Sequence, residues 1–193
     1  ECTWTGCVPS KTLIKSARVA HRVKNADKYG IITDCHFDTK NVMPYVRSVV
    51  REVYTTHTPN RLESLGVEIL FGSPTFVDAH TLHVNDCAII SEKIIIATGS
   101  QPFIPPIEGL DQVPYLTNHN LFNMEKLPKS MIILGGGAIG VEMGSAFARL
   151  GVAVTMIEMN KRILMKEDAQ LVDQLADTMR ADGVEHFVEL GGK

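Results

Sequence analysis

The sequence has no long apolar run, little net charge and few cysteines. No stretch reaches the roughly 18 apolar residues that a membrane-spanning helix needs. A formal net charge of −3 gives no electrostatic reason to expect binding to nucleic acid or to an anionic membrane. The N-terminus also lacks the charged segment and apolar segment of a secretory signal. We therefore expect a cytoplasmic protein with neither kind of partner, and an organelle location stays open.

Four cysteines are too few to form a disulfide scaffold in a chain of 193 residues. Cys35 and Cys87 are isolated in the sequence, and we expect inert, partly buried thiols at both positions. A zinc site would need a second close pair or a Cys/His cluster at ligand spacing. Because Cys35 and His36 do not provide one, the sequence predicts no metal site.

The other two cysteines, Cys2 and Cys7, belong to the segment 1–11, ECTWTGCVPSK. Pro9 suits the first turn of a helix, so Cys7 is predicted at a helix N-terminus, with Lys11 one turn further on. The helix dipole and the lysine charge are both expected to lower the pKa of the Cys7 thiol. Cys2 lies in a loop that Gly6 allows to bend back. This pattern predicts a dithiol/disulfide couple with one activated sulfur.

A second motif, GGGAIG over residues 135–140, stands between a predicted strand at 131–134 and a helix that ends at Gly151. The next strand, 152–158, ends at Glu158, near the spacing of about 20 residues typical of dinucleotide-binding folds. Gly135 allows the tight turn, Gly137 lets the backbone approach a pyrophosphate, and Gly140 allows close helix–strand packing. Glu158 would accept a hydrogen bond from a ribose 2′-hydroxyl, which favours NAD over NADP. The nearby cations Lys161 and Arg162 keep NADP open.

The rest of the chain alternates between helical and strand patterns. One helix is predicted over about 10–27. A second helix is predicted after Phe37, with Asp38 or Thr39 as its N-cap and a weak point at Pro59. A third helix is predicted from Glu167-Asp168 to Gly183. The last helix is expected to bury Leu171, Val172, Leu175 and Met179 on one face. Predicted strands cover 67–71, 75–77, 81–84, 88–90, the buried run 93–97, and 184–190, with a turn at Asn85-Asp86. Residues 101–114 are rich in Pro and Gly and are expected to form a linker.

The segment Cys-x4-Cys-Val-Pro-Ser-Lys resembles the redox-active motif of the FAD-dependent pyridine nucleotide–disulfide oxidoreductases, in the dihydrolipoamide dehydrogenase and mercuric reductase branch. Ala97-Thr98-Gly99-Ser100 resembles the second flavin-binding motif of that family, and the motifs occur in the family's order. The resemblance covers essentially the whole chain. It implies an α/β fold, with a partial FAD-binding domain and its antiparallel β excursion over 1–110, and a truncated Rossmann-type NAD-binding domain over 111–193.

The resemblance also implies a chemistry, in which electrons pass between nicotinamide, FAD and a Cys2–Cys7 disulfide. Cys7 would be the charge-transfer thiolate beside the flavin, and Cys2 would attack the substrate. Glu142 matches the acid of the family's GxGxxGxE pattern and would form an ion pair with Lys11 beside both cofactors. The implied cofactor-binding residues are Lys11, Ala97, Thr98, Gly99, Ser100, Gly135, Gly136, Gly137, Ala138, Ile139, Gly140 and Glu158.

The family's first FAD motif, its acid/base His-Glu dyad and its C-terminal interface domain have no counterpart in these residues. We therefore read the chain, which begins with Glu1, as an internal fragment that is inactive alone. The parent would be a homodimer acting on a small disulfide, a dithiol or a lipoyl group. Two alternatives stay open: a non-enzymatic dinucleotide-binding module with a redox switch, and metal reduction resembling that of mercuric reductase.

Overall fold

A computed structural model describes residues 1–32, 34 and 38–189 of the protein. The chain divides into two compact units. One unit consists of Glu1 and Glu52–Tyr115, and the other consists of Cys2–Arg51 together with Leu116–Lys193. Each unit has its own three-stranded sheet. The predicted domain boundary between residues 110 and 111 stays a prediction.

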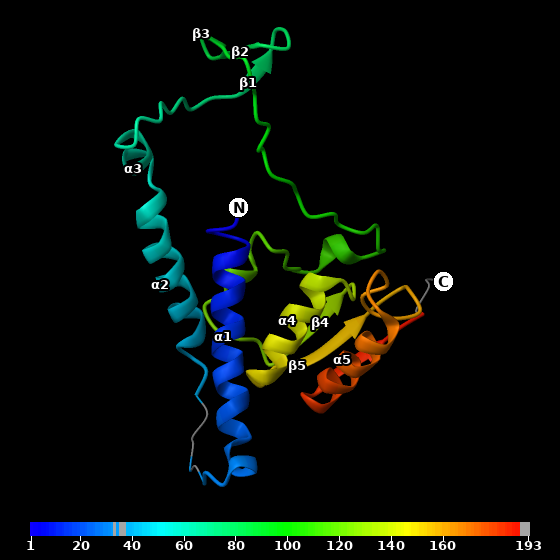
Figure 1. The fold of residues 1–193 in the computed structure, drawn as a ribbon. Coiled ribbons are helices and arrows are strands. Elements are labelled where there is room, and N and C mark those ends of the chain that lie inside the picture. Colours follow the sequence, from blue (N-terminus) through cyan, green and yellow to red (C-terminus); the bar gives the residue numbers. More distant parts are fainter. Residues whose placement is uncertain (33, 35–37, 190–193) are drawn as a thin grey trace. The chain divides into compact units, whose positions relative to one another are not determined.

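The second unit contains a parallel sheet in the order β4-β5-β6, formed by β4 (Ser130–Leu134), β5 (Ala153–Ile157) and β6 (Val184–Phe187). Helix α4 (Ala138–Arg149) connects β4 to β5, and α5 (Ala169–Ala181) connects β5 to β6 (Figure 1). Parallel neighbours joined by helical crossovers form half of a Rossmann fold. Asp168 caps α5 by accepting a hydrogen bond from the Leu171 amide at 3.1 Å. The α/β prediction for this region is confirmed.

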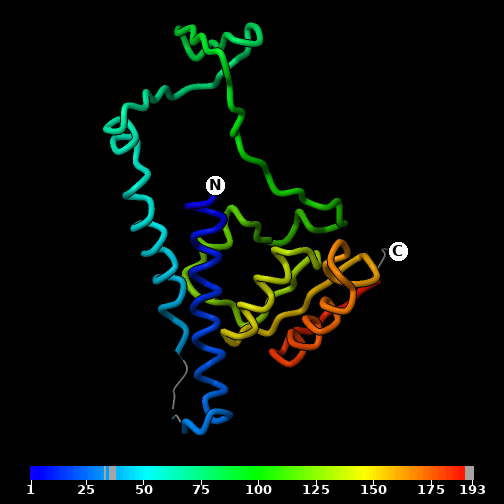
Figure 2. The backbone as a smooth tube through the Cα atoms, in the orientation of Figure 1, coloured from blue at the N-terminus to red at the C-terminus, as the bar shows by residue number. Residues whose placement is uncertain are grey.

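Helix α1 (Cys7–Lys24) packs against α4 in the core of this unit, and the tube in Figure 2 follows both helices. Leu13 of α1 and Phe147 of α4 both belong to this core and are fully buried. Met43 and Val46, from the first turns of α2 (Val42–Tyr54), are also fully buried in the same core. Because burying one large aliphatic or aromatic side chain contributes about 1.5–3 kcal/mol, this core fixes α1 firmly on α4.

A polar contact holds the same helices at their far ends. The Asp182 side chain is 7% exposed and accepts from Arg149 Nε at 2.7 Å, and its other oxygen lies 3.0 Å from His21 Nδ1. Asp182 is the C-cap residue of α5, Arg149 ends α4, and His21 lies in the last turns of α1. Lys24 adds a hydrogen bond to the Arg149 carbonyl at 3.1 Å. One carboxylate therefore ties three helices together.

The first unit contains an antiparallel meander of β1 (Pro74–Phe76), β2 (Thr81–Val84) and β3 (Cys87–Ile90). Asn85 and Asp86 form the β2–β3 turn as predicted, and Asn85 has a φ of 54°. The predicted break at Pro59 is also present. A 3₁₀ turn, η2 (Thr55–His57), precedes the short helix α3 (Pro59–Glu63), which Thr58 caps.

Two predicted strands do not form in this unit. Residues 67–71 and 93–97 have no regular structure, and Ile95 and Ile96 are 90% and 71% exposed. A strand buried on both faces needs hydrogen-bonded neighbours as well as apolar side chains. No strand in the described part of the chain pairs with either segment. The predicted linker 101–114 is irregular except for one 3₁₀ turn, η3 (Leu110–Gln112).

Several helix boundaries also differ from the predictions. Helix α1 begins at Cys7 and ends at Lys24, and a 3₁₀ turn, η1 (Ala26–Tyr29), follows it. Helix α2 begins at Val42 because residues 38–41 form turns, in which the Lys40 amide donates to Asp38 Oδ1. Leu171 is 66% exposed, so it does not belong to the buried face of α5.

The predictions for Cys35, His36, Phe37 and Leu190 lie outside the described residues. A further short 3₁₀ turn, η4 (Leu121–Asn123), precedes β4 in the second unit. None of the helices in the described ranges is long and apolar enough to cross a membrane.

We expect Asp182→Asn to lower the free energy of unfolding by about 2–3 kcal/mol, because the partly buried Arg149 would lose its ion pair. The matched control is Asp177→Asn, which breaks an exposed pair with Arg180 on the same helix and should cost at most about 1 kcal/mol. Urea unfolding of both variants measures the difference. Equal costs for the two variants would show that the Asp182 contact is not a structural clamp.

Candidate functional site

Two cysteine thiols face each other where α1 begins. Cys7 is the first residue of α1, and Cys2 precedes it in a turn closed by a 3.0 Å hydrogen bond from the Val8 amide to the Cys2 carbonyl. The two Sγ atoms lie 2.9 Å apart, and both residues are exposed. A disulfide needs a separation of about 2.05 Å, so oxidation of the pair, with loss of two electrons and two protons, requires only a small approach of the sulfurs. The turn at Gly6, the N-cap of α1, produces this proximity.

The pKa of Cys7 differs from the sequence prediction. A hydrogen bond shared with Cys2, and then the charge of Cys2, raise the pKa of the Cys7 thiol above its usual value. Its own backbone amide and Lys11 act in the opposite direction but have the smaller effect. The prediction of a lowered pKa was wrong because it considered the sulfur alone. Two adjacent thiols do not ionise independently, since a second negative charge beside the first is unfavourable.

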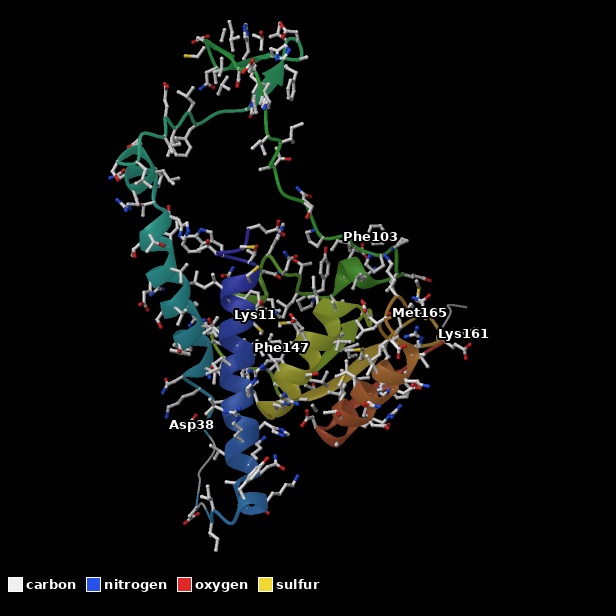
Figure 3. All side chains as sticks on the ribbon, in the orientation of Figure 1. Lys11, Asp38, Phe103, Phe147, Lys161 and Met165 are labelled. Atoms are coloured by element: carbon white, nitrogen blue, oxygen red, sulfur yellow. The ribbon has the colours of Figure 1, made fainter. Side chains whose placement is uncertain are left out.

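Lys11 connects the thiol helix to α4. Its Nζ lies 2.6 Å from Glu142 Oε1, and the two side chains are 62% and 45% exposed. Figure 3 labels Lys11 on α1. An ion pair this exposed contributes at most about 1 kcal/mol to stability. Glu142 lies beyond the first turn of α4, so it is not placed to interact with the positive end of the helix dipole. The ion pair that the resemblance implied is therefore present.

The glycine loop between β4 and α4 has the geometry that its sequence predicts. Gly135 has a φ of 106°, which favours glycine. A Cβ on Gly140 would lie 2.2 Å from the Gly135 carbonyl oxygen, so no larger residue fits there. A Cβ on Gly137 would meet nothing within 4 Å. Gly137 thus leaves open space at the N-terminus of a twelve-residue helix that begins with Ala138, where an anionic group is stabilised.

Glu158 follows β5 and is held by three hydrogen bonds. Its Oε2 accepts from the Gly136 amide at 2.7 Å. Its Oε1 accepts from the Asn160 amide at 2.8 Å and from Asn160 Nδ2 at 2.6 Å. Burial acts to raise the pKa of Glu158, but the hydrogen bonds from Asn160 and Gly136 outweigh it and hold the pKa below its usual value. The carboxylate is therefore ionised, and it braces the glycine loop.

Beyond Glu158 the surface forms an open depression. It is lined by Met159, Asn160, Lys161, Met165 and Glu189. Figure 3 labels Lys161 and Met165 near the end of β5. Sequence reasoning missed Asn160, although an Asn within three residues of a strand end is typical of a turn. It also left Arg162 open as a phosphate ligand, but the Arg162 guanidinium donates to three backbone carbonyls, those of Leu164, Met165 and Glu167.

The segment Ala97-Thr98-Gly99-Ser100 lies in the first unit and has no regular structure. All four residues are exposed, and Gly99 has a φ of 75°. The thiols, the ion pair, the glycine loop and Glu158 all lie in the second unit. Ile139, in the glycine motif, is 70% exposed at the start of α4.

We predict that Cys2→Ala lowers the pKa of Cys7, because it removes the hydrogen bond and the charge that raise it. The rate of Cys7 alkylation by iodoacetamide should then reach its half-maximum at a lower pH than in the reduced wild type. Cys87 is exposed, so the expectation of a partly buried thiol there was wrong. Peptide mass spectrometry follows Cys7 and Cys87 separately, and the Cys87 thiol serves as an internal reference. A midpoint that stays in place or rises would contradict the assigned cause.

We also predict that Gly140→Ala lowers the free energy of unfolding by about 3 kcal/mol or more, because its Cβ meets backbone that cannot yield. Gly137→Ala is the matched control. Gly137 has a φ of −75° and open space around it, so alanine should change stability by less than about 1 kcal/mol. Thermal unfolding compares the two, and equal losses would refute the close-packing role of Gly140.

Comparison with known proteins gives consistent matches. Mercuric reductase of Bacillus cereus is 32% identical over 184 residues, which are 95% of this chain and 29% of that protein. Dihydrolipoyl dehydrogenase of Acholeplasma laidlawii is 34% identical over 190 residues, covering 95% of this chain and 56% of that protein. The chain therefore spans less than two thirds of these relatives.

Solved structures and a family model agree with these relatives. The HOCl-induced flavoprotein disulfide reductase RclA from Escherichia coli matches with a TM-score of 0.78 and 31% identity, over 97% of this chain and 40% of that one. Its Cu(II) complex matches with a TM-score of 0.79. The model of the family described as pyridine nucleotide-disulphide oxidoreductase matches residues 1–189. On these grounds, the chain belongs to the pyridine nucleotide-disulphide oxidoreductase family, which binds FAD and uses NAD(P).

Proposed function

We propose that this chain carries the disulfide centre and part of the coenzyme site of a FAD-dependent NAD(P)H:disulfide oxidoreductase. The observation that carries the proposal is the arrangement of the second unit. There a thiol pair 2.9 Å apart begins α1, and Lys11 one turn later pairs with Glu142 on the helix that follows the glycine loop. Because the Lys11–Glu142 ion pair is exposed, it contributes little to the stability of the fold. A role in the site therefore explains it better than a role in the fold.

The chain's residues fit the two cofactors to different extents. Open space at Gly137 and the amides at the start of α4 suit the pyrophosphate of NAD. For FAD the chain offers Lys11 beside the thiols and the exposed residues 97–100. When bound, the flavin would supply the two-electron carrier between nicotinamide and disulfide. We assign Lys11, Ala97, Thr98, Gly99 and Ser100 to its contacts.

The thiol pair performs the exchange step in this proposal. The raised pKa of Cys7 disfavours its thiolate, so we assign the attack on the substrate to Cys2. The Cys2 thiolate attacks a substrate disulfide, forms a mixed disulfide and releases one substrate thiolate. Cys7 then loses its proton and attacks the Cys2 sulfur, which releases the second thiolate and leaves the Cys2–Cys7 disulfide. The dithiol thus gives two electrons to the substrate, and Cys7, the other sulfur of the pair, is assigned to the flavin side.

We further propose a small disulfide, a dithiol or a lipoyl group as the substrate, a cytoplasmic location, and a homodimeric parent protein. Residues 1–193 alone would not complete the catalytic cycle, because no described residue is matched to the family's acid/base pair. Flavin bound at full occupancy with disulfide turnover by these residues alone would overturn that statement.

Metal reduction is the second candidate function. The exposed thiol pair is a suitable ligand for a soft metal ion, and several relatives are named mercuric reductase. The solved Cu(II) complex is described for RclA alone. The non-enzymatic alternative, a redox switch on a dinucleotide-binding module, requires coenzyme binding without turnover of any disulfide. A full-length protein with bound flavin and reductase activity would exclude it.

The central prediction concerns this chain directly. Under mild oxidation Cys2 and Cys7 should form an intramolecular disulfide, because their Sγ atoms lie 2.9 Å apart, while Cys87 stays reactive to the alkylating agent. Mass spectrometry after alkylation detects both results.

NAD⁺ should also bind in calorimetric titration, and Gly137→Ala should weaken that binding by about tenfold without unfolding the protein. Absence of the disulfide would refute the redox assignment, and unchanged affinity in Gly137→Ala would refute the coenzyme assignment.

A further inference from the structure

Asn160 has a role that the family comparison does not assign to it. It is an exposed residue next to the buried Glu158, and it donates two of the three hydrogen bonds that the carboxylate receives. A carboxylate has about four acceptor positions, two on each oxygen. Asn160 occupies both positions on Oε1, at 2.8 and 2.6 Å, and the Gly136 amide occupies one on Oε2. With Oε1 occupied by both Asn160 donors, Oε2 is the oxygen to which a ligand can donate.

Oε2 is also the oxygen that braces the glycine loop. A Cβ on Gly136 would come within 3.2 Å of Oε2, so backbone and carboxylate are in close contact there. A hydroxyl group can donate to that oxygen. A dianionic phosphate group cannot, because its oxygens are all acceptors and carry negative charge beside an ionised carboxylate that is 9% exposed.

The neighbouring cations do not reverse this preference. The Arg162 guanidinium is committed to backbone carbonyls, so it does not reach toward a ligand phosphate. Lys161 lines the depression, but Glu189 lines it as well and offsets the lysine charge. Glu167 contacts the Arg162 guanidinium through its backbone carbonyl oxygen.

We propose that Asn160 is a positioning residue for coenzyme selection: it holds Glu158 with only Oε2 available, so that the site accepts a ribose with a free 2′-hydroxyl and rejects a 2′-phosphate. The inference rests on the proposed function, since it requires that the glycine loop binds a dinucleotide. It goes further because it assigns the choice between NAD and NADP to Asn160 as well as to Glu158.

The test is calorimetric titration of the purified protein with NAD⁺ and with NADP⁺. Wild type should prefer NAD⁺. In Asn160→Ala the Kd for NAD⁺ should rise roughly three- to tenfold, because Glu158 loses one orienting hydrogen bond, and the Kd for NADP⁺ should stay the same. Asn60→Ala is the control, because it removes an exposed asparagine in the other unit and should change neither constant.

A pH series separates positioning from a general loss of structure. The hydrogen bonds from Asn160 help to hold the pKa of Glu158 low, so rejection of NADP⁺ should weaken as the pH falls through that pKa. In Asn160→Ala the same weakening should occur at a higher pH. The ionisable groups Lys161 and Glu189 are unchanged in the variant, and the 2′-phosphate titrates equally with both proteins.

Asn160→Ser, which keeps a short donor, should recover part of the preference, and thermal unfolding verifies that each variant is folded. A variant Asn160→Ala with the wild-type preference and the wild-type pH series would overturn the inference and leave dinucleotide binding intact. Equal affinity of the wild type for the two coenzymes would also overturn it. If wild type binds neither coenzyme, the coenzyme site of the proposed function fails, and the inference fails with it.

Discussion

The packing of α1 against α4 is the contact on which the candidate site depends. Leu13 and Phe147 are fully buried in the core that these helices share, and the Asp182 carboxylate holds their far ends. Since both helices are rigid, this packing sets where α1 begins relative to the glycine loop. The near ends then bring Lys11 to Glu142, across 131 positions of sequence. The proposed redox and coenzyme sites are therefore joined by an apolar core that takes no part in either.

The local motifs could be predicted from sequence because their constraints are short-range. Gly140 must be glycine because a backbone oxygen stands where its Cβ would be, and Pro59 must interrupt a helix because it lacks an N–H group. Asn85 adopts a positive φ that the two-residue turn requires. In each case the residue type and its immediate neighbours contain the physical cause, so pattern and structure agree.

Other features depend on partners that a local pattern does not specify. The apolar run at 93–97 shows that burial would be favourable, but Ile95 is 90% exposed because no described strand pairs with its segment. The pKa of Cys7 depends on how near the Cys2 sulfur lies, and the sequence predicted only the helix end and Lys11. Asn160 went unnoticed because its importance comes from Glu158 and the glycine loop, which the fold brings to it.

The two glutamates of the site show how burial separates two uses of one side chain. Glu142 is 45% exposed and pairs directly with Lys11 at the surface, so the contact can open and close at a cost of about 1 kcal/mol or less. Glu158 is 9% exposed and satisfied by three hydrogen bonds, so each bond lost would leave a buried charge poorly solvated. A contact near reacting groups benefits from mobility, whereas a contact that discriminates between ligands must stay in place. The exposed ion pair is suited to the first task, and the braced carboxylate is suited to the second.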